Sequence, residues 1–143
     1  MIGYNGAMPF DSTVRVRYAE TDQMGVVYHS NYVIYFEIGR TEAMRQIGIS
    51  YRDLELRGYA LAVIETHARH AASARYDDVL TLRTWLREVT RTRLRFEYAV
   101  LREDKLLTTG HTVLAFLSRE GGMKPVRCPP DVEALARAAV EPA

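Results

Sequence analysis

The spacing of apolar and polar residues changes along the chain, and each spacing predicts a different element. Residues 13–18 alternate two valines with two arginines, the twofold period of a half-buried strand. Residues 31–47 place apolar or small side chains three and four positions apart, which predicts a helix. Ser30 or Asn31 can cap the start of this helix, and Gly48 can end it.

The predicted helix is apolar on nearly all sides in its first half, YVIYFEI. A helix of this kind is expected deep in a core rather than along a surface. Gly39 has no side chain, so we expect a sheet to approach the helix closely there.

The rest of the chain predicts a short helix and then mostly strands. Ser50, with Asp53 three residues later, resembles a capping box, and Gly58 can end the helix that it starts. Clear alternation predicts strands over residues 79–89 and 93–100. A less regular pattern predicts a strand over residues 59–67, and residues 106–117 are predicted as a long strand with apolar residues on both faces. A short tail helix is expected after Pro130. This order predicts an α+β fold in which an antiparallel sheet of about five strands wraps around one long central helix.

Length and composition indicate one compact domain. The 143 residues are 48% hydrophobic and 26% charged, the balance of a globular protein. Because the patterned sequence begins after residue 12, we expect an N-terminal extension over residues 1–12 and a single domain over residues 13–143.

Charge and cysteine content limit the partners and the compartment. A formal net charge of +1, with both signs interspersed, predicts no nucleic-acid partner. The single cysteine cannot close an intrachain disulfide, and no apolar run is long enough to predict a membrane span. Since the first residues also lack the pattern of a signal peptide, we expect a cytoplasmic location.

The stretch TDQMGVVYHSNY, residues 21–32, lies between the first strand and the long helix. Gly25 permits a sharp turn after Asp22, and His29 directly precedes the helix. An aspartate in such a turn often hydrogen-bonds its own backbone, but a carboxylate ionised at neutral pH can also act as a base. His29 is either incidental to the helix entry or part of a site.

A longer stretch that includes these residues, RYAETDQMGVVYHSNYVIYFEIGRTEAM, resembles the signature of the 4-hydroxybenzoyl-CoA and acyl-CoA thioesterases of the hotdog fold. The segments ARYDDVLTL and MKPVRCP are similar to later parts of the same family, so the resemblance covers roughly residues 13–130. It implies an enzyme that hydrolyses a thioester to a carboxylic acid and free coenzyme A.

The resemblance also implies roles for individual residues. The carboxylate of Asp22 is expected to act as base or nucleophile, and the backbone N–H at His29 to polarise the thioester carbonyl. The first turn of a helix has unpaired N–H groups and a partial positive field, which suits that second role. Tyr18 either lines the pocket or merely packs. Further substrate contacts are expected from Gly25, Val26, Val27, Tyr28 and Asn31.

Several arginines lie near predicted loops, where they could hold the phosphates of coenzyme A. Arg69, Arg75 and Arg91 are the candidates, with Arg93 beside them. The alternative is an ordinary solvated face, which charged residues of this kind also form.

Two other kinds of chemistry are alternatives to thioester hydrolysis. His67 and His70, three apart in a predicted strand, point to opposite faces, so together with His111 they predict no metal site. Glu37, Glu42 and Glu65 suggest the acid chemistry of hotdog dehydratases or of the thioesterases that carry their carboxylate on the helix. Glu37 lies too far into the helix to meet a group at its start, so it is expected to be polar helix surface.

We therefore expect a thioester hydrolase that acts on acyl-CoA and needs no metal or redox cofactor. A sheet around one helix leaves an outer face and an edge strand uncovered, which predicts a homodimer or homotetramer with the active site between subunits. A non-catalytic acyl-CoA or acyl-carrier binding module, or a hydratase or dehydratase on the same scaffold, are the alternatives.

Overall fold

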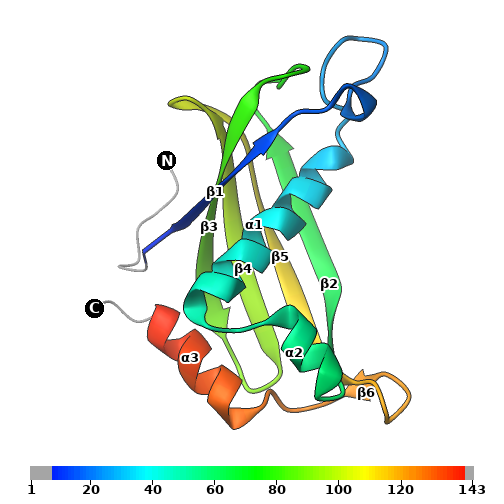
Figure 1. Cartoon of the computed structure of the whole chain (residues 1–143), viewed down its shortest axis with the longest axis vertical. Coiled ribbons are helices and arrows are strands. Elements are labelled where there is room, and N and C mark those ends of the chain that lie inside the picture. The colour runs from blue at the N-terminus through cyan, green and yellow to red at the C-terminus, as the bar shows by residue number, and fades with distance from the viewer. Residues whose placement is uncertain (1–7, 141–143) are drawn as a thin grey trace.

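The computed structural model describes residues 8–140, which form one curled antiparallel sheet around a long helix (Figure 1). The strand order is β1-β3-β4-β5-β2, with β6 paired to β5. The strands are β1 (Phe10–Arg15), β2 (Tyr59–His70), β3 (Val79–Val89), β4 (Arg93–Arg102), β5 (Lys105–Ser118) and β6 (Lys124–Pro125). The helices are the short 3₁₀ turn η1 (Tyr18–Glu20), α1 (Asn31–Ile47), α2 (Tyr51–Leu56) and α3 (Pro130–Val140). The predicted α+β architecture is confirmed.

The long helix α1 has the predicted bounds. Gly48 ends it in the left-handed region, with φ 102°, and donates its N–H to the carbonyls of Met44 and Arg45. Ser30 is the N-cap residue but makes no capping hydrogen bond with its side chain. At α2 the capping prediction is confirmed, because Ser50 Oγ accepts the Asp53 N–H at 3.2 Å.

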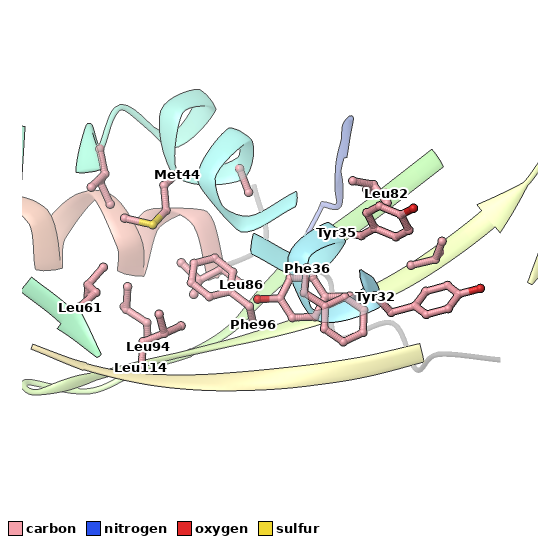
Figure 2. Close-up of a cluster of buried hydrophobic side chains, with 14 of the residues drawn as sticks. Tyr32, Tyr35, Phe36, Met44, Leu61, Leu82, Leu86, Leu94, Phe96 and Leu114 are labelled. Atoms are coloured by element: carbon pink, nitrogen blue, oxygen red, sulfur yellow. The ribbon is translucent and has the colours of Figure 1, made fainter. Parts of the chain in front are cut away.

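The core lies between α1 and the concave face of the sheet (Figure 2). Phe36 stacks on Tyr98 of β4 with ring centroids 4.4 Å apart. Gly39 follows on the same side of the helix, and a Cβ added there would lie 2.6 Å from Thr84 Oγ1. Only glycine permits this approach, as the sequence predicted.

One expectation about α1 is wrong within a single chain. The helix was expected to be buried nearly all round, but Val33 and Ile34 are 42% and 47% exposed. Its apolar first half therefore has an uncovered side, which lies away from the sheet core formed by Tyr35 and Phe36.

Other differences concern element bounds. The first strand was predicted over residues 13–18, but β1 begins at Phe10 and ends at Arg15, and Tyr18 starts η1. The expected extension over residues 1–12 therefore contributes its last residues to the sheet, while residues 1–7 lie outside the described part. The two-residue strand β6 was not predicted, and β2 continues to His70. Between residues 8 and 140, no helix combines the length and apolar character needed to cross a membrane.

Candidate active site

The loop that carries Asp22 is a tight turn held by its own backbone. The Asp22 N–H donates to the Val26 carbonyl and the Gly25 N–H to the Asp22 carbonyl, both at 2.9 Å. Gly25 has φ 78°, a conformation that favours glycine. Asp22 Oδ1 accepts the Met24 N–H at 2.9 Å, so the side chain does bond its own turn. Its Oδ2 has no hydrogen-bond partner among residues 8–140 and is free to act on a ligand.

The turn is followed by the start of α1, which has unpaired backbone donors. The Tyr28 N–H donates to the Glu20 carbonyl and the Asn31 N–H to the Tyr28 carbonyl, each at 2.9 Å. In the described part of the chain, the N–H groups of His29 and Ser30 have no acceptor. Two donors are therefore available at the positive end of the helix.

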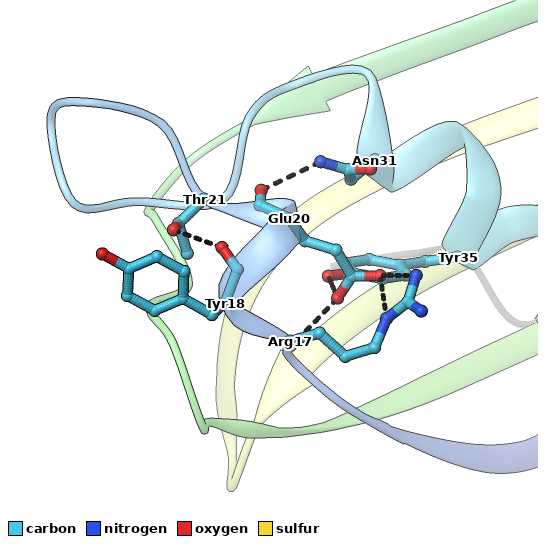
Figure 3. A network of polar contacts seen from close by, with 6 residues as sticks. All are labelled: Arg17, Tyr18, Glu20, Thr21, Asn31 and Tyr35. Carbon is cyan, nitrogen blue, oxygen red and sulfur yellow. Dashed lines mark hydrogen bonds and ion pairs between the residues drawn. The ribbon is translucent and has the colours of Figure 1, made fainter.

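A buried carboxylate fixes the helix start to the turn before it (Figure 3). Glu20 is 5% exposed, and its side chain accepts the Arg17 N–H at 2.8 Å and the Tyr35 hydroxyl at 3.0 Å. The Arg17 guanidinium also pairs with it, at 3.3 Å. The backbone carbonyl of Glu20 accepts the Asn31 side-chain amide at 2.9 Å. Asn31, expected to contact substrate, therefore holds the helix start in place.

Burial raises the pKa of Tyr35 far above its ordinary value, and its hydrogen bond to Glu20 acts in the same direction. The phenol is therefore neutral and remains a donor at physiological pH. Glu20 was not among the residues predicted for the site. The signal available was a glutamate three residues after Arg17, within the quoted signature and two residues before Asp22.

Asp22 and the helix start share an open hollow with a volume of about 270 Å³. Five of the predicted site residues line it: Asp22, Val26, Val27, Tyr28 and His29. Five lining residues were not predicted: Met24, Tyr32, His70, Ala72 and Ser73. The missed residues come partly from the end of β2 and the loop after it, which lie far from Asp22 in the sequence.

His70 lies at the end of β2, where its Nδ1 is 3.0 Å from Thr108 Oγ1 of β5. Its ring packs against the ring of Tyr32, with centroids 4.9 Å apart. From the sequence, this histidine is expected to be solvated or packed on a strand. The structure instead places it on the wall of the same hollow as Asp22.

Tyr18 does not line the hollow. Its side chain is 77% exposed and packs edge-on against Tyr76, with centroids 5.6 Å apart. Figure 3 shows the ring of Tyr18 turned away from the cluster around Glu20. Of the two expectations for this residue, packing fits the single chain.

The candidate arginines are separated by the fold. The Nη1 atom of Arg75 is 3.9 Å from a Cβ built on Gly25, so Arg75 lies beside the Asp22 turn. Arg69 follows Ala68, which packs on the core, and alternation along the strand directs Arg69 to the opposite face. Arg91 lies in the turn between β3 and β4, near the other end of the sheet (Figure 1).

The register of the strands shows how far Arg91 and Arg93 lie from the hollow that contains Asp22. Arg93 pairs with Ala115, which pairs with Ala62, eight residues before His70 on β2. Eight residues of strand span roughly 26 Å. Within one chain, Arg91 and Arg93 therefore do not reach the hollow that contains Asp22.

The other acidic and imidazole groups lie elsewhere. His67 stacks on His111 with centroids 5.3 Å apart, and His111 Nε2 is 3.0 Å from Glu65 Oε1. Glu37 lines a second hollow of about 240 Å³ with Arg40 and Tyr51 and not the hollow of Asp22. Across residues 8–140, no three His, Cys, Asp or Glu side chains gather as a metal site would require.

The fold and the site together define a class of protein. A carboxylate on a hydrogen-bonded turn and unpaired amide donors at a helix start lie around one hollow. Amide donors of this kind stabilise the oxyanion that forms when a carbonyl is attacked, and a carboxylate can activate the attacking group. This arrangement is suited to hydrolysis of an acyl compound.

Comparison with known proteins gives the family. A family model described as the thioesterase-like superfamily matches residues 16–135. The acyl-CoA thioesterase YbgC of Haemophilus influenzae is 34% identical over 126 residues, which cover 87% of this chain and 92% of that protein. The putative acyl-CoA thioesterase YneP of Bacillus subtilis is 37% identical over 75 residues, 52% of this chain and 54% of that protein. The chain belongs to the thioesterase-like superfamily.

Solved structures agree with this assignment. The DHNA-CoA thioesterase of Staphylococcus aureus has a TM-score of 0.88 and 30% identity, covering 92% of this chain and 90% of that one. The hypothetical protein TT1821 of Thermus thermophilus has a TM-score of 0.86 and 36% identity, covering 90% and 98%. The predicted hotdog fold, the predicted family and the predicted enzyme class, a thioester hydrolase, are confirmed.

Proposed function

We propose that this protein hydrolyses acyl-CoA thioesters to a carboxylic acid and free coenzyme A. The observation that carries the proposal is the position of Asp22 and the unpaired His29 amide around one hollow. The names of the relatives, which include acyl-CoA thioesterases, support the same substrate class. The reaction needs no metal or redox cofactor, because a carboxylate and amide donors supply a base and an oxyanion site.

In the proposed reaction, the thioester carbonyl oxygen accepts hydrogen bonds from the amide of His29 and its neighbour at the start of α1. Asp22 acts through Oδ2 as general base towards water, or attacks the carbonyl itself as nucleophile. Its Oδ1 remains bonded to the Met24 N–H at 2.9 Å, which fixes the orientation of the carboxylate. A fixed carboxylate loses less entropy on reaching the reactive geometry.

For the coenzyme A phosphates, Arg75 is the candidate that best fits a single chain, because it lies beside the Asp22 turn. Arginine suits this role because its planar guanidinium can bind phosphate with two donors. Arg69 and Arg91 would need a second subunit to contribute to the same site.

We also propose that the chain assembles as a homodimer or a homotetramer through β2. This strand has 12 residues and lies at an edge of the sheet. Val63 and Ile64 near its centre are 46% and 49% exposed. Val33 and Ile34 on the uncovered side of α1 are also exposed. A long apolar edge strand is an aggregation hazard unless something covers it, and a second copy related by a twofold axis would do so.

The experiment that tests the function is a thiol-release assay over aromatic, short-chain and long-chain acyl-CoAs, with the wild type and Asp22→Asn. Loss of the base should lower turnover by at least about a hundredfold. Asp104→Asn, in the exposed turn between β4 and β5, is the matched control and should keep wild-type turnover.

Each alternative predicts a different result in the same assay. A binding module would retain acyl-CoA without releasing thiol, and a hydratase or dehydratase would change the acyl group while the thioester stayed intact. An Asp22→Asn variant within a fewfold of the wild type would contradict the role of Asp22.

A further inference from the structure

The imidazole of His70 is held on the wall of the candidate site by a buried hydroxyl. His70 and Thr108 face one another in the register of β2 and β5, with Nδ1 and Oγ1 3.0 Å apart. Thr108 is fully buried, and Oγ1 has no other hydrogen-bond partner in the described chain. A buried hydroxyl needs an acceptor for its proton. His70 Nδ1, 3.0 Å away, is the atom within reach to accept it.

This hydrogen bond decides the form of the imidazole. If Nδ1 accepts from the Thr108 hydroxyl, the ring is neutral and Nε2 carries the proton. The two ring nitrogens lie on different sides of the ring, so Nε2–H points away from Thr108. Among residues 8–140, no group accepts this N–H.

Tyr32 fixes the ring from a second direction. Its own ring packs on His70 with centroids 4.9 Å apart, and it is only 3% exposed. The Tyr32 hydroxyl accepts the Ala74 N–H at 3.2 Å, so the tyrosine is itself anchored to the loop after β2. His70 therefore presents one fixed donor at the hollow that it shares with Asp22 and His29.

We propose that His70 is a further catalytic residue, which donates its Nε2–H hydrogen bond to the thioester sulfur as the carbon–sulfur bond breaks. The proposal rests on the proposed function. Hydrolysis places negative charge first on the carbonyl oxygen and then on the departing sulfur. The amides at the start of α1 donate hydrogen bonds to the carbonyl oxygen. His70 lies on a different element, at the end of β2, and donates to the sulfur. A neutral imidazole can act as such a donor without losing its proton.

The atoms balance without any further reactant. Water forms the new carbon–oxygen bond and gives a proton to the Asp22 carboxylate. The carbon–sulfur bond then breaks, and its electron pair leaves with sulfur as a thiolate bonded to His70. The proton held by Asp22 reaches the thiolate through solvent, which gives the acid, the free thiol and the starting enzyme. Thr108 and Tyr32 are positioning residues for His70.

The test compares two thioesters of the same acyl group, one of coenzyme A and one of an aromatic thiol. An aromatic thiolate leaves readily and gains little from a hydrogen bond at sulfur. His70→Phe keeps a ring against Tyr32 but removes the donor, and should lower kcat for the acyl-CoA by about a hundredfold, the scale of one lost donor. For the aromatic thioester, kcat should stay within about threefold, since the donor adds little there.

Two threonine variants separate a loss of His70 orientation from a general effect on the structure. Thr108→Val removes the hydroxyl that orients His70 and should show a smaller loss with the same dependence on the leaving group. Thr112→Val is the matched control, because Thr112 is equally buried on β5 but its hydroxyl pairs with Tyr98 at 2.5 Å. It should affect both thioesters alike. Equal losses on both thioesters in His70→Phe would overturn the proposal.

A second measurement does not depend on turnover. In a protein with ¹⁵N-labelled histidine, imidazole spectra should show a neutral His70 protonated at Nε2, with the Nδ1 signal altered in Thr108→Val. Protonation at Nδ1 would overturn the proposal whatever the kinetics. If the tautomer is as expected but neither thioester is hydrolysed, the proposed function has failed and the role of His70 falls with it.

Discussion

Tyr35 Oη donates a hydrogen bond of 3.0 Å to Glu20 Oε1, and this bond joins the second turn of α1 to the 3₁₀ turn before Asp22. Both groups are buried, with Glu20 5% and Tyr35 0% exposed. The same glutamate receives the backbone N–H and the guanidinium of Arg17. One carboxylate therefore sets the distance between the turn that carries the proposed base and the helix that carries the proposed oxyanion donors.

Tyr35→Phe should destabilise the protein and reduce its activity. The change removes one donor to a buried carboxylate, which costs about 1–3 kcal/mol. Because the hydrogen bond that joins the turn to the first part of α1 is then absent, the rate of thioester hydrolysis should fall as well. Urea unfolding measures the first effect and thiol release the second. Tyr51→Phe is the matched control, since its hydroxyl makes only a long bond of 3.4 Å to the Leu61 carbonyl. Equal stability of the two variants would contradict the role of the Glu20 bond.

The stability difference between the wild type and Tyr35→Phe should depend on pH in the alkaline range. Burial raises the pKa of Tyr35 in the folded state, and the bond to Glu20 adds to the rise. A group whose folded pKa is raised stabilises the fold fully below its unfolded pKa, here about 10, and this stability is lost as pH rises through the folded value. The difference between the two proteins should thus be constant from pH 7 to 9 and shrink above about pH 10. Unfolding in urea at each pH checks this, and a constant difference would refute it.

The elements of the fold could be predicted because their signals are local. The bounds of α1 follow from its apolar spacing and from Gly48, and β3 follows from simple alternation. The missed parts of the site depend on residues far apart in the sequence. Glu20 meets Tyr35 15 positions later, and His70 meets Thr108 38 positions later. No local pattern distinguishes these polar residues from solvated ones.

For a related reason, the sequence could not separate the candidate arginines from one another. Loops at both ends of a sheet have the same composition, so the sequence does not say which end a charged loop occupies. The structure places Arg75 near Asp22 and Arg91 near the opposite end. The uncovered side of α1 illustrates the same limit, because Val33 and Ile34 carry an apolar pattern whose partner does not lie within the single chain.

If β2 forms the subunit interface, a charge at its centre should break the assembly. Ile64→Lys places an ammonium on the exposed edge, where pairing with a second copy would bury it at a large cost. Light scattering at micromolar concentration should show a dimer or tetramer for the wild type and monomers for the variant, with reduced activity. Leu56→Lys on α2 is the matched control, because Leu56 is an aliphatic residue that is 79% exposed. A wild-type protein that is an active monomer would rule out the proposed assembly.

The last prediction separates the backbone of His29 from its side chain. His29→Ala keeps the unpaired N–H and should cost about tenfold or less in turnover, whereas His29→Pro removes this donor and should cost about 10² to 10³, the scale for one oxyanion-hole donor. Ser30→Pro is a useful comparison, because Ser30 has φ −65°, which proline adopts without strain, and proline is tolerated at the start of a helix. It removes the neighbouring amide and should cost less than His29→Pro. Circular dichroism and thermal melting must first show that both proline variants are folded. If folded His29→Pro hydrolyses its best substrate as fast as His29→Ala, the carbonyl is not polarised by this amide, and the start of α1 loses the role proposed for it.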